Sequence, residues 1–183
     1  DEFDPPVVSH EFGHYIQRWY SRSSNPGGAH DGRPADPNLA FGEGGASFLG
    51  SLITGSRYYI DAGVTRLRLL QDLQAIPPNR TYAADPAQPL TQPISEWLVA
   101  GAQYAMFRAS TNVEQQTGRA MRVLTGYLRR SPYPDRAEPG VDLVEYLDGY
   151  LCVNDGAERA TITSYLVTQR RFPYDFGYTA VCR

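Results

Sequence analysis

The sequence has no lysine, only two cysteines and no long apolar run. All 17 basic residues are arginine, and with 20 acidic residues the formal net charge is −3. This balance leaves no broad basic face, which argues against a generic nucleic-acid binder and against a binder of anionic membranes. A membrane span needs roughly 18 consecutive apolar residues. No run in the sequence approaches that length, so we expect no membrane span.

The two cysteines, Cys152 and Cys182, are too few for a disulfide scaffold. They could form one bridge or remain two buried thiols, and the sequence leaves both readings open. The chain begins at Asp1 without an initiator methionine or a signal peptide, which suggests a mature or excised piece of a longer precursor. The 13 tyrosines and 14 prolines favour an exported protein.

The length of 183 residues suits a single domain, and the predicted fold class is mainly α. Apolar residues recur every three or four positions between stretches rich in proline and glycine. We expect residues 1–60 to carry the functional helices and residues 61–183 to form a helical lobe. The predicted helices cover residues 4 to about 22, 36–55, 65–74, 94–108, 113–130, 141–151 and 157–170. The only predicted strands are 57–60 and 178–181.

The first predicted helix contains His-Glu-Phe-Gly-His, and Asp4 followed by Pro5 is typical of a helix start. His10 and His14 are four residues apart, so both imidazoles leave the same face of the helix, one turn apart. That spacing lets both bind one metal ion. Glu11 flanks the same face, where it can hold a metal-bound water without being a ligand. The alternative is a chance string on an amphipathic helix.

The apolar residues of this helix predict how it packs. Val7, Val8, Phe12 and Ile16 are expected to bury the side away from the histidines. Gly13 is expected to leave space beside His10 and His14.

A catalytic zinc site needs a third protein ligand and one open position for water. The metzincin pattern would place another histidine six residues after His14, but that position holds Tyr20. Glu43 fits instead, 29 residues after His14, in the run Phe-Gly-Glu-Gly-Gly-Ala-Ser-Phe of the second predicted helix. Each glycine inside a helix costs about 1 kcal/mol relative to alanine. Close approach of another helix or of a metal is the physical reason for so many.

The two runs His-Glu-Phe-Gly-His-Tyr and Gly-Glu-Gly-Gly-Ala-Ser-Phe resemble the gluzincin zinc metallopeptidases. The second run is similar to the Asn-Glu-Gly-Phe-Ala-Ser-Tyr helix of the M1-like aminopeptidase branch. The stretch also resembles uncharacterised exported bacterial proteins, and the resemblance covers about residues 4–55. It implies that zinc (Zn2+) is held by His10, His14 and Glu43 and that Glu11 is the general base. It further implies a secreted or extracellular bacterial protein.

Three positions depart from these patterns. Gly42 stands where the M1-like pattern has asparagine, and Gly45 stands where that pattern has an aromatic residue. The thermolysin-like branch has an acidic residue four positions after its glutamate ligand, where it orients a histidine ligand, and here that residue is Ser47. We therefore expect the support of His10 or His14 to come from elsewhere.

The loop between the two predicted helices contains His30, the third histidine of the chain. It could stabilise the oxyanion, replace Glu43 as a ligand, or be a loop histidine bonded to Asp31. Asp31 and Asp36 are rival oxygen ligands, although Asp36 is better explained as the cap of its helix.

Gluzincins usually place a tyrosine or histidine donor opposite the metal to stabilise the oxyanion. Tyr59 is the candidate, with Tyr58 beside it and Tyr104 as another. A half-buried aromatic pair is the plain alternative for Tyr58 and Tyr59. Glu96 is interpreted only as the entry to a helix.

The predicted function is zinc-dependent hydrolysis of a bond in a peptide or protein substrate. Glu11 would take a proton from the zinc-bound water and pass it to the leaving amine. Gluzincins carry a β-rich lobe before the metal helix, and only nine residues precede His10. We therefore expect a second chain or an N-terminal portion to complete the groove. The alternative is a catalytically inactive structural or assembly module that retains a zincin-like site.

Overall fold

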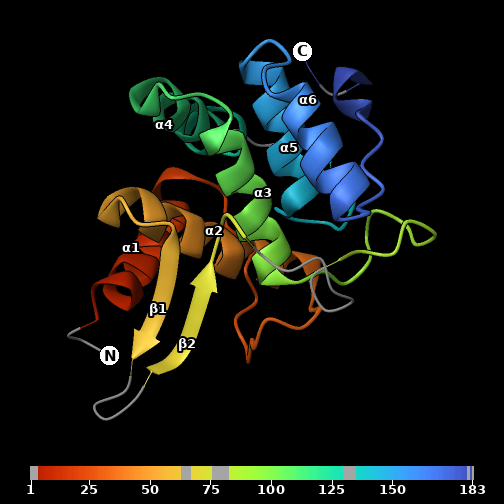
Figure 1. The fold of residues 1–183 in the computed structure, drawn as a ribbon. Helices are drawn as coiled ribbons and strands as arrows, with labels where there is room; N and C mark the ends of the chain where they lie inside the picture. The colour runs from red at the N-terminus through yellow and green to blue at the C-terminus, as the bar shows by residue number, and fades with distance from the viewer. Residues whose placement is uncertain (1–3, 63–66, 76–82, 130–134, 181, 183) are drawn as a thin grey trace.

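The chain is mainly helical with one two-stranded sheet, as seen in a computed structural model (Figure 1). The structure describes residues 4–62, 67–75, 83–129, 135–180 and 182. The prediction of a mainly α fold is confirmed. Helices α1 and α2 lie with the hairpin at one end, and α3 leads from them into the helices of the C-terminal half (Figure 1). None of the described helices is long and apolar enough to cross a bilayer.

Helix α1 spans Pro5–Tyr20 and begins where the sequence predicts, with proline in its first turn. The Asp4 carboxylate does not cap the helix but accepts a hydrogen bond from the Ala62 backbone N–H at 2.6 Å. This contact ties the start of α1 to the end of the first strand.

Helix α2 spans Pro37–Thr54 and is capped at both ends. The Asp36 side chain accepts hydrogen bonds from the backbone N–H groups of Asn38 and Leu39, at 2.9 and 3.1 Å. Gly55 ends the helix in a left-handed conformation with φ of 65°. Asp36 therefore serves as a helix cap, as expected, rather than as a metal ligand.

Helices α1 and α2 approach each other closely because glycine occupies the contact. A Cβ on Gly13 would lie 2.6 Å from the Ala46 carbonyl oxygen and 2.8 Å from its Cα. On another side of α2, a Cβ on Gly44 would strike the Glu96 backbone of α3 (Glu96–Arg108). The glycines that weaken α2 as an isolated helix thus let it pack tightly against both neighbours.

The outer side of α1 is exposed, which contradicts the expectation for two of its apolar residues. Val8 and Phe12 are 49% and 51% exposed, while Ile16 is partly buried against the core. Tyr15 and Trp19 extend the same exposed stripe, and the Phe12 and Tyr15 rings stack at 5.5 Å. The prediction failed because α1 buries its histidine-bearing side, and no described residue covers the other.

The sheet is an antiparallel hairpin of β1 (Tyr58–Ala62) and β2 (Leu67–Asp72). The strand predicted at 57–60 is confirmed with a small shift, but the helix predicted at 65–74 is wrong. Leucines at positions 67, 69 and 73 are separated by even numbers of residues, which is the period of a strand. Positions 65 and 66 lie outside the described residues.

Helix α3 begins at Glu96, close to the predicted start, and its first turn is fixed by Ser95. The Ser95 hydroxyl accepts a hydrogen bond from the Trp97 backbone N–H at 3.1 Å and donates one to the Gly32 carbonyl at 2.6 Å. The second bond ties the loop between α1 and α2 to the start of α3. Trp97 is buried in the core, at 4% exposed.

The C-terminal half is helical close to the predicted boundaries. Its elements are α4 (Val113–Arg122) continued by the π-helical η1 (Val123–Tyr127), then α5 (Leu143–Val153), and α6 (Arg159–Thr161) continued by the π-helical η2 (Ile162–Gln169). Their buried faces include Leu147, Tyr150 and Leu166, which join the main core. This is the ordinary packing that the apolar spacing predicts.

A disulfide joins Cys152, in α5, to Cys182 and settles the choice that the sequence leaves open. The disulfide fixes the C-terminal segment to α5.

The strand predicted in this segment, at 178–181, is wrong. Gly177–Ala180 forms a short 3₁₀ helix, η3, and the Cys182 N–H bonds to the Tyr178 carbonyl at 2.9 Å. Local hydrogen bonds replace those of a strand there, and position 181 lies outside the described residues.

We expect Gly13→Ala to lower the free energy of unfolding by about 1–3 kcal/mol, because the new methyl group overlaps the Ala46 backbone. The control is Gly118→Ala in α4, where the new Cβ meets only the flexible Arg122 guanidinium at 3.6 Å. This control should be neutral or gain up to about 1 kcal/mol from helix propensity. Urea unfolding measures both, and equal midpoints would contradict the close contact.

Candidate metal centre

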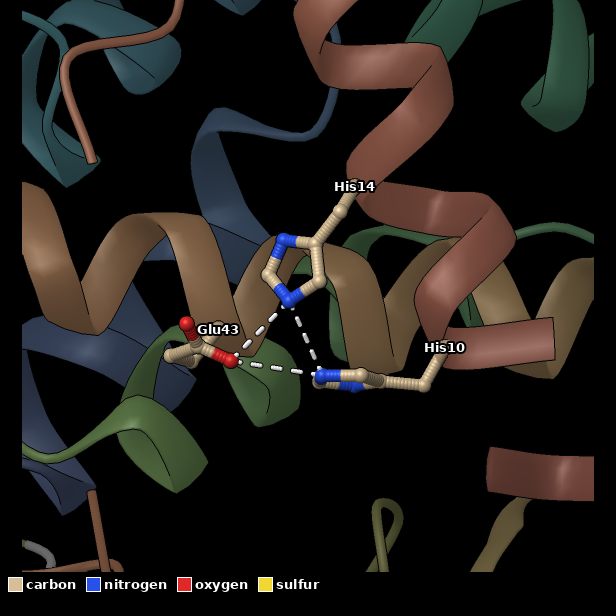
Figure 2. A group of neighbouring side chains, drawn as sticks. All are labelled: His10, His14 and Glu43. Atoms are coloured by element: carbon tan, nitrogen blue, oxygen red, sulfur yellow. Dashed lines mark hydrogen bonds and ion pairs between the residues drawn. The ribbon is translucent and has the colours of Figure 1, made fainter. Parts of the chain in front are cut away.

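Three side chains from α1 and α2 converge on one point (Figure 2). His10 Nε2 and His14 Nε2 are 3.1 Å apart, and Glu43 Oε2 lies 3.2 and 3.1 Å from them. Around an ion with ligands at 2.0–2.1 Å, tetrahedral ligand atoms lie about 3.3 Å apart. The three atoms therefore have the spacing of three corners of a tetrahedral zinc site.

The site is buried on one side and open on the other. His10 and Glu43 are 5% and 6% exposed, whereas the His14 side chain is 28% exposed. The two histidines lie one turn apart on α1, and the close crossing at Gly13 brings α2 near enough for the Glu43 carboxylate to reach both. Two imidazoles and one carboxylate suit zinc and other borderline divalent ions.

Two further side chains hold His10 and Glu43 in orientation. The His10 Nδ1 is 3.0 Å from the Ser47 hydroxyl, which leaves Nε2 directed at the site. Asn25 donates a hydrogen bond to Glu43 Oε1 at 3.0 Å, which leaves Oε2 directed at the site. From the sequence, the support for His10 is expected to come from a residue other than Ser47. That expectation is wrong, because Ser47 itself contacts the His10 ring. Such outer partners fix ring orientation and raise metal affinity.

The Glu43 carboxyl is shifted toward its charged form. Burial alone would raise its pKa, but hydrogen bonds with His10, His14 and Asn25 together hold the pKa below its ordinary value. Glu43 is thus an anion at neutral pH, which is the form that binds a metal.

His30 lies beside the three-residue group and not against Asp31. Its Nδ1 is 2.9 Å from Glu96 Oε2, and its Nε2 is 3.4 Å from Glu43 Oε2. The hydrogen bond with Glu96 raises the pKa of His30 and outweighs burial, and the charges of Glu96, Glu43 and Glu11 raise it further. Asp31 instead contacts Arg33, so it is not placed as a ligand.

Tyr59 borders the site from β1. Its ring packs edge-on against the His10 ring, with centroids 5.6 Å apart, and lies 5.5 Å from the Trp97 ring. Burial is the main cause that raises the pKa of Tyr59 to about 12, so the hydroxyl keeps its proton at neutral pH. Tyr58 contacts Arg57 instead, and Tyr104 packs on Phe107.

Glu11 is an exposed residue of α1, next to His10. Its negative charge contributes to the raised pKa of both His30 and Tyr59. Glu11 is therefore close enough for its charge to act on both residues, and no described contact fixes where its carboxylate points.

Sequence reasoning missed three residues of this site. Asn25 and Glu96 reach it from a loop and from α3, and no local pattern marks either. Ser47 could have been predicted, because it lies one helical turn after Glu43 and therefore on the same face of α2.

The chain matches no protein-family model, no curated protein and no solved structure. The inference of function therefore depends on the geometry and chemistry of the site.

If Glu43 is the third ligand, Glu43→Ala should lower zinc affinity by more than roughly 100-fold, since loss of an outer partner alone costs about 10–100-fold. Titration of the metal-free protein against a fluorescent zinc chelator measures the affinity. The matched control is Glu114→Ala, which removes an exposed carboxylate from α4. Stoichiometric, tight zinc binding by Glu43→Ala would show that the third ligand is misassigned.

We expect Ser47→Ala to weaken zinc binding by about 10–100-fold, because the His10 ring loses its Nδ1 partner. The variant should fold normally, since alanine is a better helix former than serine. Zinc titration and circular dichroism test both statements. An affinity equal to that of the unmodified protein would exclude a supporting role for Ser47.

Proposed function

We propose that the protein is a zinc-dependent metallopeptidase whose zinc is held by His10, His14 and Glu43. The observation that carries the proposal is the convergence of two imidazole nitrogens and one carboxylate oxygen at 3.1–3.2 Å from one another. Catalytic zinc sites use three protein ligands, whereas structural sites use four. The partial exposure of His14 supports an open fourth position.

The residues around the site support peptide hydrolysis. Bound zinc would act as a Lewis acid and lower the pKa of a water toward about 7. Glu11 would accept the proton of the attacking water and return it to the leaving amine. Tyr59 and His30 are the candidate donors that would stabilise negative charge on the carbonyl oxygen.

The proposed setting is outside the cell, in a bacterial protein that acts on peptides or proteins. The disulfide between Cys152 and Cys182 supports an oxidising compartment. The exposed stripe of Val8, Phe12 and Trp19 on α1 supports a second chain or a further polypeptide portion that packs there and completes the groove.

The alternative is an inactive structural or assembly module that retains the site. A metal ion that only stabilises the fold would be expected to have four protein ligands. His10, His14 and Glu43 offer three ligand atoms to one point, His30 groups with Glu43 and Glu96 beside it rather than with the other two histidines, and Glu11 directly follows His10 in α1. These features favour the enzyme.

We expect Glu11→Gln to retain zinc but to lower kcat/KM for peptide hydrolysis by about 10²–10⁴-fold, the usual contribution of a general base. Glutamine keeps the size of the side chain but cannot accept the proton. A fluorogenic peptide library, with and without chelator, measures the activity, and elemental analysis measures the zinc. Glu114→Gln, far along the chain in α4, is the control for loss of an exposed carboxylate. Unchanged turnover in Glu11→Gln would refute the mechanism.

A further inference from the structure

We propose that Glu96 restrains His30 so that this third histidine stays out of the metal's coordination sphere and the fourth position remains open. The inference depends on the proposed zinc site. Glu96 is on this account a positioning residue, which acts through His30 and does not touch the metal.

His30 lies near enough to become a ligand but is not placed as one. Its Nε2 is 3.4 Å from Glu43 Oε2, close to the spacing of about 3.3 Å between two ligands of one tetrahedral ion. Its ring centroid, however, is 6.5 Å from that of His10, whereas the His10 and His14 centroids are 4.7 Å apart. The potential ligand atoms of His30 group with Glu43 and Glu96, and not with His10 and His14.

Glu96 supplies the restraint from a rigid position. Its side chain is 7% exposed, and Oε2 lies 2.9 Å from His30 Nδ1. A carboxylate only accepts hydrogen bonds, so Nδ1 is the donor and Nε2 is the nitrogen that faces Glu43. The start of α3 that carries Glu96 is fixed by the Ser95 cap and by the tight contact with Gly44.

The loop that carries His30 is tied at Gly32 to Ser95, but the His30 side chain itself is held by two carboxylates. Gly27, Gly28 and Gly32 have positive φ angles of 69°, 131° and 83°, and the His30 side chain is 40% exposed. Among the described residues, Glu96 and Glu43 are its only hydrogen-bond or ion-pair partners. Loss of the Glu96 acceptor would therefore free the ring to turn its Nε2 toward the ion. A zinc ion with four protein ligands has no position left for water or substrate.

The test compares Glu96→Ala, Glu96→Gln and the double variant His30→Ala/Glu96→Ala, each loaded with cobalt in place of zinc. Acetohydroxamate serves as the probe of the open position, and its binding is followed by the visible absorption of the cobalt. We expect Glu96→Ala to bind metal at least as tightly but acetohydroxamate about 10–100-fold more weakly, the range seen for outer partners. The double variant should bind the probe more tightly than Glu96→Ala does, because the intruding imidazole is gone. Glu96→Gln keeps an acceptor oxygen for Nδ1 and should stay within a few-fold of the unmodified protein.

A second measurement needs no variant. Proton NMR of the cobalt-loaded protein counts the strongly shifted, exchangeable N–H signals of coordinated imidazoles, and two are expected. Three such signals would overturn the proposal, as would a folded Glu96→Ala protein with unchanged acetohydroxamate affinity or a double variant that binds the probe no more tightly than Glu96→Ala. A protein that binds neither zinc nor cobalt would overturn the proposed function as well, so the two failures are distinguishable.

Discussion

The backbone contact between α1 and α2 is the constraint on which the candidate metal centre depends. A Cβ on Gly13 would lie 2.6 Å from the Ala46 carbonyl oxygen, so the helices can cross at this separation only with glycine there. The crossing places Glu43 opposite the two histidines that one helical turn aligns. A larger separation would leave a carboxylate and two imidazoles in the same region without a shared point.

Hydrogen-bond partners explain how the side chains of the candidate site are oriented and why His30 lies beside the group of three. Ser47 contacts Nδ1 of His10, and Asn25 donates a hydrogen bond to Oε1 of Glu43. The other two atoms, His10 Nε2 and Glu43 Oε2, are therefore left to face each other. Glu96 does the same for His30 but directs it beside the group rather than into it. In the proposed zinc site, metal affinity and an open position would thus be set by different side chains, on α2, on a loop and on α3.

The sequence predicts local features well and long-range features poorly. The positions of His10, His14 and Glu43 follow from helical spacing and from the unusual glycine content around Glu43, and both helix starts follow from Asp-Pro pairs. The sequence predicts a helix where the second strand of the hairpin lies, because the leucines at 67, 69, 70 and 73 fit both a helical and a strand period. The exposed side of α1, and the reach of Glu96 to His30, depend on how distant elements pack, which no local pattern encodes.

The central claim is that one metal ion is shared by side chains of two crossing helices. The most direct measurement is a crystal of the protein soaked in zinc, with diffraction recorded on both sides of the zinc absorption edge. The account predicts one strong anomalous peak within about 2.0–2.2 Å of His10 Nε2, His14 Nε2 and Glu43 Oε2. A map with no peak between these three atoms, or with zinc only at unrelated surface residues, would contradict it.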